Sequence, residues 1–80
     1  MRVVRHWWNQ QWGRLGRRDV YVRGDGTRFE VEVAQGGAEG KRWVALFDSV
    51  EEAVEEAERH LLDPHDRWRD VSDAHNAHHG

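Results

Sequence analysis

The clearest apolar pattern covers residues 49–62 and predicts an amphipathic helix. Its apolar positions recur every three or four residues, which is the spacing of one helix face. Ser49 and Glu52 have the spacing of a capping box, in which each side chain binds a free amide of the first turn. Asp63-Pro64 ends the helix, because a residue before proline avoids helical backbone angles. The apolar stripe consists of Val50, Ala53, Val54, Ala57 and Leu61.

Two runs before this helix, residues 20–23 and 28–33, alternate apolar and polar side chains with the period of a β-strand. Asp25-Gly26 lies between them and is typical of a tight hairpin turn. A turn centred there puts the apolar residues on one face and leaves Tyr21, Glu30 and Glu32 on the other. The predicted pairs are Val22 with Phe29 and Val20 with Val31.

Residues 41–47 predict a third strand, which is apolar on both faces. If residues 36–40 form a glycine-rich loop, Val44 and Leu46 emerge beside Tyr21 on the face opposite the helix. A register slip of one residue would exchange the two sets of side chains. One helix covers only one side of a sheet, so in either register apolar side chains of this strand are left without cover from it. The pairs expected in the first of these registers are Val33 with Trp43, Val31 with Ala45, and Phe29 with Phe47.

The N-terminal stretch roughly follows helical spacing, and residues 3–12 predict a short helix. An extended arm across the sheet is the alternative. The expected fold is therefore α+β, with a three-stranded antiparallel sheet packed on a C-terminal helix and a short Trp-rich N-terminal helix or arm. We divide the chain into a Trp/Arg-rich segment at 1–18, a β-β-β-α core at 19–63 and a polar tail at 64–80, which we expect to be flexible.

This predicted order of elements, the run Phe29–Val33 and the pair Gly36-Gly37 resemble the double-stranded-RNA-binding domain over about residues 3–62. The resemblance implies a sheet with the C-terminal helix on one face. Members of that family place lysines at the start of the last helix to hold phosphates. Here residues 49–56 carry four glutamates, which repel a phosphate backbone, so no residue is carried over as an RNA contact.

Composition narrows the class of protein. Eighty residues make one domain at most, and the absence of cysteine excludes disulfides and cysteine-ligated metal. No apolar run approaches the length of a membrane span and the first residues do not read as a signal peptide, so we expect a cytoplasmic protein. The charge is divided: residues 1–28 carry +5, residues 29–66 carry −8 and residues 67–80 are neutral.

Candidate chemistry is sparse, and we expect no enzyme and no cofactor. The only serines are Ser49, which caps the helix, and Ser72 in the tail, and no phosphate-binding glycine motif is present. His75, His78 and His79 have metal-binding spacing, but a polar tail with adventitious affinity explains them better, so we predict no metal site.

A basic, aromatic segment near the N-terminus is the first candidate contact surface. Arginine beside tryptophan suits stacking on single-stranded nucleic acid, and it suits a protein interface equally well. The third interpretation is that the tryptophans fill the core of a small domain. The residues concerned are Trp7, Trp8, Trp12, Arg14, Arg17 and Arg18.

The outer face of the predicted helix is acidic and is the second candidate. A solvated face is the ordinary interpretation. The functional interpretation is that its carboxylates imitate a phosphate backbone and occupy a basic groove on another protein. Small acidic phage inhibitors resemble this chain in general character. The acidic residues are Glu51, Glu52, Glu55, Glu56 and Glu58.

Together these features predict a small non-enzymatic protein-binding module, a regulator or inhibitor of phage or mobile-element type that docks on a larger protein or nucleoprotein complex. Its contact surface would combine the tryptophans with Tyr21, Val44 and Leu46, and a homodimer would cover the same apolar groups. The alternative is a nucleic-acid-binding protein that uses the basic N-terminal segment. We expect no membrane partner.

Overall fold

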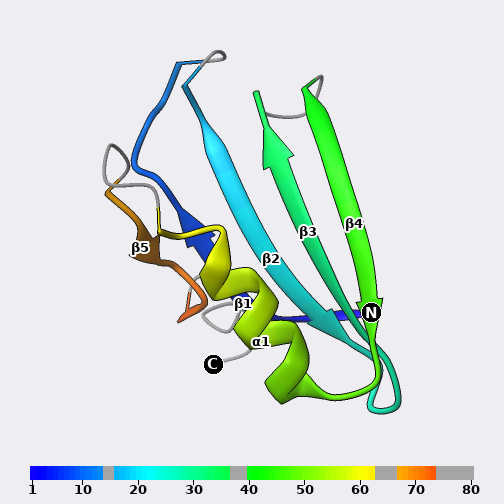
Figure 1. Cartoon of the computed structure of the whole chain (residues 1–80). Coiled ribbons are helices and arrows are strands. Elements are labelled where there is room, and N and C mark those ends of the chain that lie inside the picture. The colour runs from blue at the N-terminus through cyan, green and yellow to red at the C-terminus, as the bar shows by residue number, and fades with distance from the viewer. Residues whose placement is uncertain (14–15, 37–39, 63–66, 74–80) are drawn as a thin grey trace.

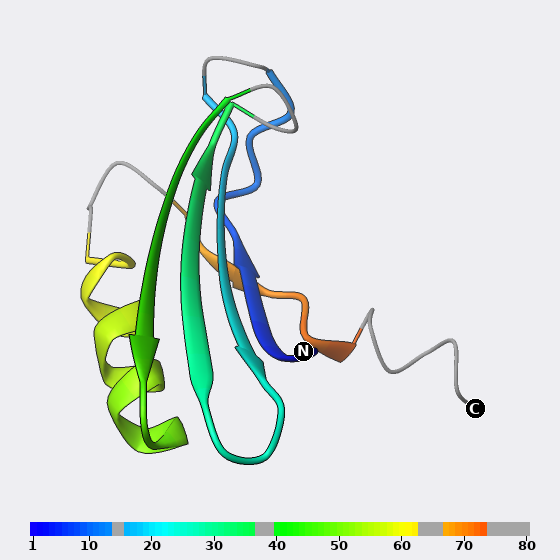
Figure 2. The same ribbon diagram turned by 90° about the vertical axis from the view of Figure 1, so that its right-hand side faces the viewer.

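The computed structural model describes residues 1–13, 16–36, 40–62 and 67–73. It contains one antiparallel sheet of five strands in the order β4-β3-β2-β1-β5, with one helix against it (Figure 1). Figure 2 shows that the helix lies on one side of the sheet, so the described chain has two layers. The elements are β1 (Arg2–Trp8), β2 (Arg18–Gly24), β3 (Phe29–Gln35), β4 (Lys41–Phe47), α1 (Val50–Arg59) and β5 (Arg69–Asp70).

The α+β class holds, but the prediction of three strands and an N-terminal helix is wrong. Residues 2–8 form β1, which pairs antiparallel with β2. β-Branched and aromatic side chains favour a strand there, and tertiary pairing overrides a roughly helical spacing. As a strand, this segment gives the backbone of β2 a second partner and places Trp7 beside Val20 in the core.

The same finding corrects the resemblance to the double-stranded-RNA-binding domain. The first element of that fold is a helix, whereas the first element here is a strand, β1, which lies between β2 and β5 in the sheet. The observed order, β-β-β-β-α-β, retains only the hairpin, the third strand and the following helix of the expected topology.

The C-terminal residues 67–73 add to the sheet, although the sequence indicated only a tail. β5 pairs with the end of β1, and the Val71 amide donates to the His6 carbonyl at 2.8 Å. The Arg5 guanidinium contacts Asp70 at 2.9 Å, and Trp68 packs against the core. Residues from all three predicted segments therefore share one sheet.

The predicted helix is present, although it spans Val50–Arg59 and not the whole of residues 49–62. The Ser49 hydroxyl accepts a hydrogen bond from the Glu52 amide at 3.2 Å, as an N-cap should, and the helix ends at Arg59. Ala53 and Ala57 are fully buried against β2 and β3, together with Val20, Val22 and Val31. Alanines at these positions let the helix approach the sheet closely, because they present no side chain beyond Cβ.

The predicted pairing of β3 with β4 is also confirmed, from Phe29 opposite Phe47 to Val33 opposite Trp43. The β2–β3 hairpin has the predicted faces but a register two residues away from the predicted one, with Val22 opposite Val31. The Asp25 carboxylate accepts from the amides of Thr27 and Arg28, which centres the turn on Gly26-Thr27. Gly26 has a φ of 97°, a conformation that favours glycine.

This register has two physical causes beyond the turn. It places Arg23 opposite Glu30, whereas the predicted register would have placed it opposite Arg28. It also places Phe29 opposite Gly24, where a Cβ would lie 2.7 Å from the Phe29 ring. A shift of two residues keeps every side chain on its face, which explains why the faces were predicted correctly.

Candidate functional site

The sheet face that carries no helix, called here the open face, is the candidate site. Val20 and Val22 of β2 point to the helix, so the alternating residues Asp19, Tyr21 and Arg23 point to the open face. Figure 2 shows the helix on the other side of the sheet. The open face therefore has to be stabilised by its own side chains.

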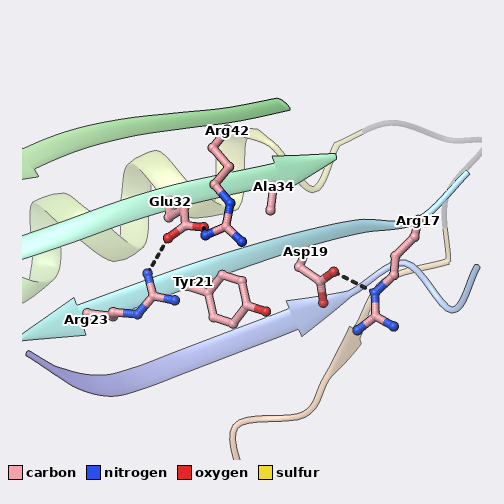
Figure 3. Close-up of a pocket in the computed structure, with 7 residues that line it drawn as sticks. All are labelled: Arg17, Asp19, Tyr21, Arg23, Glu32, Ala34 and Arg42. Carbon is pink, nitrogen blue, oxygen red and sulfur yellow. Dashed lines mark hydrogen bonds and ion pairs between the residues drawn. The ribbon is translucent and has the colours of Figure 1, made fainter. Parts of the chain in front are cut away.

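A hollow of about 300 Å³ lies on this face over β2 and β3. Figure 3 shows its side chains, with the Tyr21 ring between Arg23 and Asp19. Three guanidinium groups meet two carboxylates there, so cationic and anionic groups alternate across the hollow. The lining residues are Arg17, Asp19, Tyr21, Arg23, Glu32, Ala34 and Arg42.

Glu32 is the centre of the first ion-pair network. Its carboxylate is buried and contacts two arginines from neighbouring strands, Arg23 at 2.6 Å and Arg42 at 2.9 Å. Arg23 also reaches Glu30 at 3.4 Å. A buried carboxylate needs such partners because water no longer solvates it. The network links β2, β3 and β4 by their side chains.

Asp19 is the centre of the second network. Its buried carboxylate lies 2.8 Å from the His6 Nε2 and 2.9 Å from the Arg17 Nε. Burial raises the pKa of Asp19, but hydrogen bonds from His6 and Arg17 outweigh it, and the pKa is below its usual value. Asp19 is therefore a carboxylate near neutral pH, so His6 and Arg17 are the donors.

Tyr21 joins the two networks through its ring. The His6 ring stacks on it with centroids 4.1 Å apart, and the Arg23 guanidinium lies 4.4 Å from the ring centre. Burial raises the pKa of the Tyr21 hydroxyl, with a further contribution from the Asp19 charge. The phenol stays neutral at physiological pH and presents a polar group on a half-buried aromatic ring.

An aromatic rim adjoins this end of the open face. Trp12 is 79% exposed and meets the Trp8 ring edge-on at 4.5 Å. The Arg17 guanidinium lies 5.8 Å from the centre of the Trp8 ring. Buried Asn9 braces the connection between β1 and β2, because its side chain donates to the Gly16 carbonyl and accepts from the Arg18 amide.

The β4 side of the open face is apolar. Val44 and Leu46 are 52% and 57% exposed, and Glu32 of β3 lies directly opposite Val44. The open face therefore changes from charged and aromatic, over β1 to β3 and at Arg42, to aliphatic at Val44 and Leu46 of β4. Such a combination is typical of a surface that contacts another macromolecule.

The structure divides the predicted contact residues between the two faces. Trp8, Trp12, Arg17 and Tyr21 lie at the open face near one another, and Val44 and Leu46 lie on it at β4. Trp7 and Arg18 do not join them. Trp7 is buried in the core, and Arg18 alternates with Asp19 and so lies on the helix side. Arg14 lies outside the described residues.

The polar centre of this site was not predicted from the sequence; it includes His6, Asp19, Arg23 and Arg42. His6 could not be placed because its segment was interpreted as a helix. A signal did exist for the rest, since opposite charges recur on the outward positions of strands predicted to be neighbours, as in Arg23 and Glu30.

The acidic residues lie on the helix, away from the open face. Glu51, Glu52, Glu55 and Glu58 are exposed, while Glu56 is half-buried and contacts Arg59 at 2.9 Å. Arg59 also contacts Glu55 at 3.1 Å, an i,i+4 ion pair on the helix surface. A second hollow, between this helix and β1, is lined by Val4, Arg5, Val50, Glu51, Val54, Glu55 and Glu58.

In the described ranges, no helix is long and apolar enough to cross a membrane. Among the same residues, no group of three or more histidine and acidic side chains is placed to hold a metal ion. The predicted histidine cluster, His75, His78 and His79, lies outside the described residues, so its chemistry stays a prediction.

Comparison with protein-family models finds no match to this chain, and comparisons with curated proteins and with solved structures find none either.

Proposed function

We propose that the chain is a non-enzymatic module that binds another protein through its open face. The observation that carries this proposal is the exposure of Val44 and Leu46, 52% and 57%, on a face that the helix leaves uncovered. Burial of apolar surface contributes roughly 25 cal/mol per Å², so a partner that covers these side chains gains affinity.

The rest of the open face supplies the groups that protein interfaces favour. Trp, Tyr and Arg are the residue types that most often contribute large binding energies, and Trp12, Tyr21 and Arg17 are all near the hollow. An ion pair with Asp19 holds Arg17 in place before binding, and contacts with the His6 ring and the Arg23 guanidinium hold Tyr21, which lowers the entropy lost on association.

The arrangement of the carboxylates supports binding over catalysis. Asp19 is held between a histidine and an arginine, and Glu32 between two arginines, so neither has the free position that a general base offers to a substrate proton. The regulator or inhibitor role and the cytoplasmic location stay predictions from the sequence.

Nucleic-acid binding is the second candidate, and the exposed Trp12 with Trp8 and Arg17 favours it. A stacking ring beside a guanidinium suits single-stranded nucleic acid. The arginines of the hollow already contact carboxylates, so a phosphate would have to compete with Asp19 and Glu32 for them. We therefore rank this candidate below protein binding.

Affinity capture with two matched variants tests the proposal. Leu46→Asp puts a charge on the open face, and Leu62→Asp puts one on a still more exposed leucine that follows the helix, 78% accessible. The immobilised wild-type chain and the Leu62→Asp variant should retain the same host protein in equal amounts, as quantified by mass spectrometry. The Leu46→Asp variant should retain at least tenfold less of it. Equal capture by both variants would contradict the proposal.

A salt titration with single-stranded and duplex oligonucleotides tests the second candidate. Nucleic-acid binding requires affinity at low salt that falls steeply as salt rises, and that weakens when Arg17 is changed to alanine. Absence of binding at low salt removes this candidate.

A further inference from the structure

Strand β4 forms one edge of the sheet, and among the described residues only β3 pairs with it. In Figure 1, β4 lies at the right-hand side of the sheet, with no described segment beyond it. Its outward N–H and C=O groups therefore have no partner in the sheet. The opposite edge differs, because β5 has two residues and β4 has seven.

The β4 edge lacks the features that usually prevent pairing with another chain. It contains no proline, and its register with β3 runs without a bulge from Lys41 to Phe47. Its charges are confined to Lys41 and Arg42 at one end. Three large apolar side chains on it are substantially exposed, namely Trp43, Val44 and Leu46.

We propose that a second copy of this chain pairs with β4 antiparallel, about a two-fold axis through Ala45, and forms one continuous ten-stranded sheet. A symmetric pair requires a strand that is complementary to itself when it is turned end to end, and β4 meets this requirement. The inference concerns the free edge of β4 and goes beyond the proposed function of the open face.

The register follows from the residues that would face each other across the axis. Trp43 opposes Phe47 of the second copy, and Val44 opposes its Leu46, so aromatic meets aromatic and aliphatic meets aliphatic. Arg42, which also contacts Glu32 of its own chain at 2.9 Å, opposes Asp48 of the second copy, one residue beyond the strand, so the charges at both ends are opposite in sign. Each of these pairs occurs twice in the dimer.

The neighbouring register, centred on Val44, is less favourable. It would place Lys41 opposite Phe47 and Arg42 opposite Leu46, and so set charged groups against apolar ones. Charge and apolar complementarity therefore favour the axis through Ala45 over the axis through Val44.

The packing around β4 leaves room for this pairing. Trp43 is 44% exposed on the helix side, where its ring lies 5.1 Å from His60, and Phe47 is half-buried on the same side. Paired about the axis, these rings lie between the helices of the two copies and cover one another. On the other side, Val44 and Leu46 of both copies form one apolar stripe across the centre of the enlarged open face.

Sedimentation velocity on the purified chain, over a range of concentrations, tests the dimer without any other partner. We expect the wild type to dimerise and Asp48→Arg to raise the dimer dissociation constant about tenfold, because two arginines then face each other at each end. Asp48→Glu keeps the charge and should dimerise as the wild type does. A wild type that stays monomeric, or an Asp48→Arg chain that dimerises equally well, overturns the proposal.

Disulfide cross-linking tests the axis directly, because the natural chain has no cysteine. Ala45→Cys places two thiols opposite each other at the axis, within reach of a disulfide. It should cross-link at least tenfold faster under mild oxidation than Leu62→Cys, which is exposed but away from the edge. Equal rates overturn the proposed pairing. Because both experiments use the purified chain alone, their failure leaves the capture result of the open face intact.

Discussion

The two faces of this sheet are stabilised by different physics, although the same strands build both. The helix-covered face is apolar: Val20, Val22 and Val31 are fully buried under Ala53 and Ala57. The open face has no covering layer and is held by ion pairs and ring contacts, centred on Asp19 and Glu32. The difference shows how a domain of this size can form a core on one side and keep the other side available for contact.

The largest expected difference in stability between the two faces is that between a tryptophan substitution on one and a tryptophan substitution on the other. Trp7 is only 9% exposed on the helix side, and its change to alanine should destabilise the fold by about 3–5 kcal/mol. That is comparable to the roughly 3–5 kcal/mol that so small a core supplies, so the variant should be largely unfolded. Trp12→Ala, at the exposed rim, should change stability by at most about 0.5 kcal/mol.

Urea unfolding followed by circular dichroism checks this pair. Equal losses of stability for the two tryptophans would show that the faces do not differ as described.

The carboxylates of β3 give the next contrast, now within the open face. Glu32→Gln removes a buried charge that two arginines hold and should cost about 1–2 kcal/mol. Glu30→Gln removes a weaker contact, 3.4 Å from Arg23, and should cost at most about 0.5 kcal/mol. Thermal unfolding of both variants at low and moderate salt measures the difference. A Glu32→Gln protein as stable as the wild type would show that this network adds nothing to the fold.

Protonation of the aspartates in acid gives the smallest expected change in stability. The hydrogen bonds from Arg28 and Thr27 to Asp25 lower its pKa to about 2, and the pKa values of Asp19 and Asp70 are also lowered. An unfolded aspartate titrates near pH 3.9, so between about pH 4 and pH 2 the unfolded chain binds more protons. The stability these groups provide is therefore present above about pH 4 and is lost as the pH falls towards 2.

Urea midpoints between pH 5 and pH 2 measure this loss. Asp25→Asn keeps an acceptor oxygen but cannot titrate, so its stability should fall less steeply with acid than that of the wild type. Identical slopes would contradict the assignment.

The elements that the sequence predicted correctly are those with several local signals in agreement. The helix has a cap and an apolar stripe, and the observed pairing of Val31 with Ala45 is the one that the apolar pattern predicted. The residues around Trp7 have no local signals that agree in this way. Their apolar spacing fits a helix only roughly, and it fits a strand no worse. Only pairing with β2 decides between them, and pairing is not a local property.

The site was predicted in part for the same reason. The alternation of β2 and β4 placed Tyr21, Val44 and Leu46 on the open face from the sequence alone. The contact between His6 and Asp19 depends on β1 lying beside β2, and β5 depends on side chains such as Asp70 that reach Arg5. Contacts between distant segments could be found only once the order of the strands was known.

Hydroxyl-radical footprinting of the chain in complex with its captured partner tests binding through the open face, because it reports which side chains become covered. We expect strong protection of Trp12, Tyr21 and Leu46, and unchanged labelling of Leu62. Protection confined to the helix side, with Trp12 and Leu46 labelled as in the free chain, would contradict this expectation.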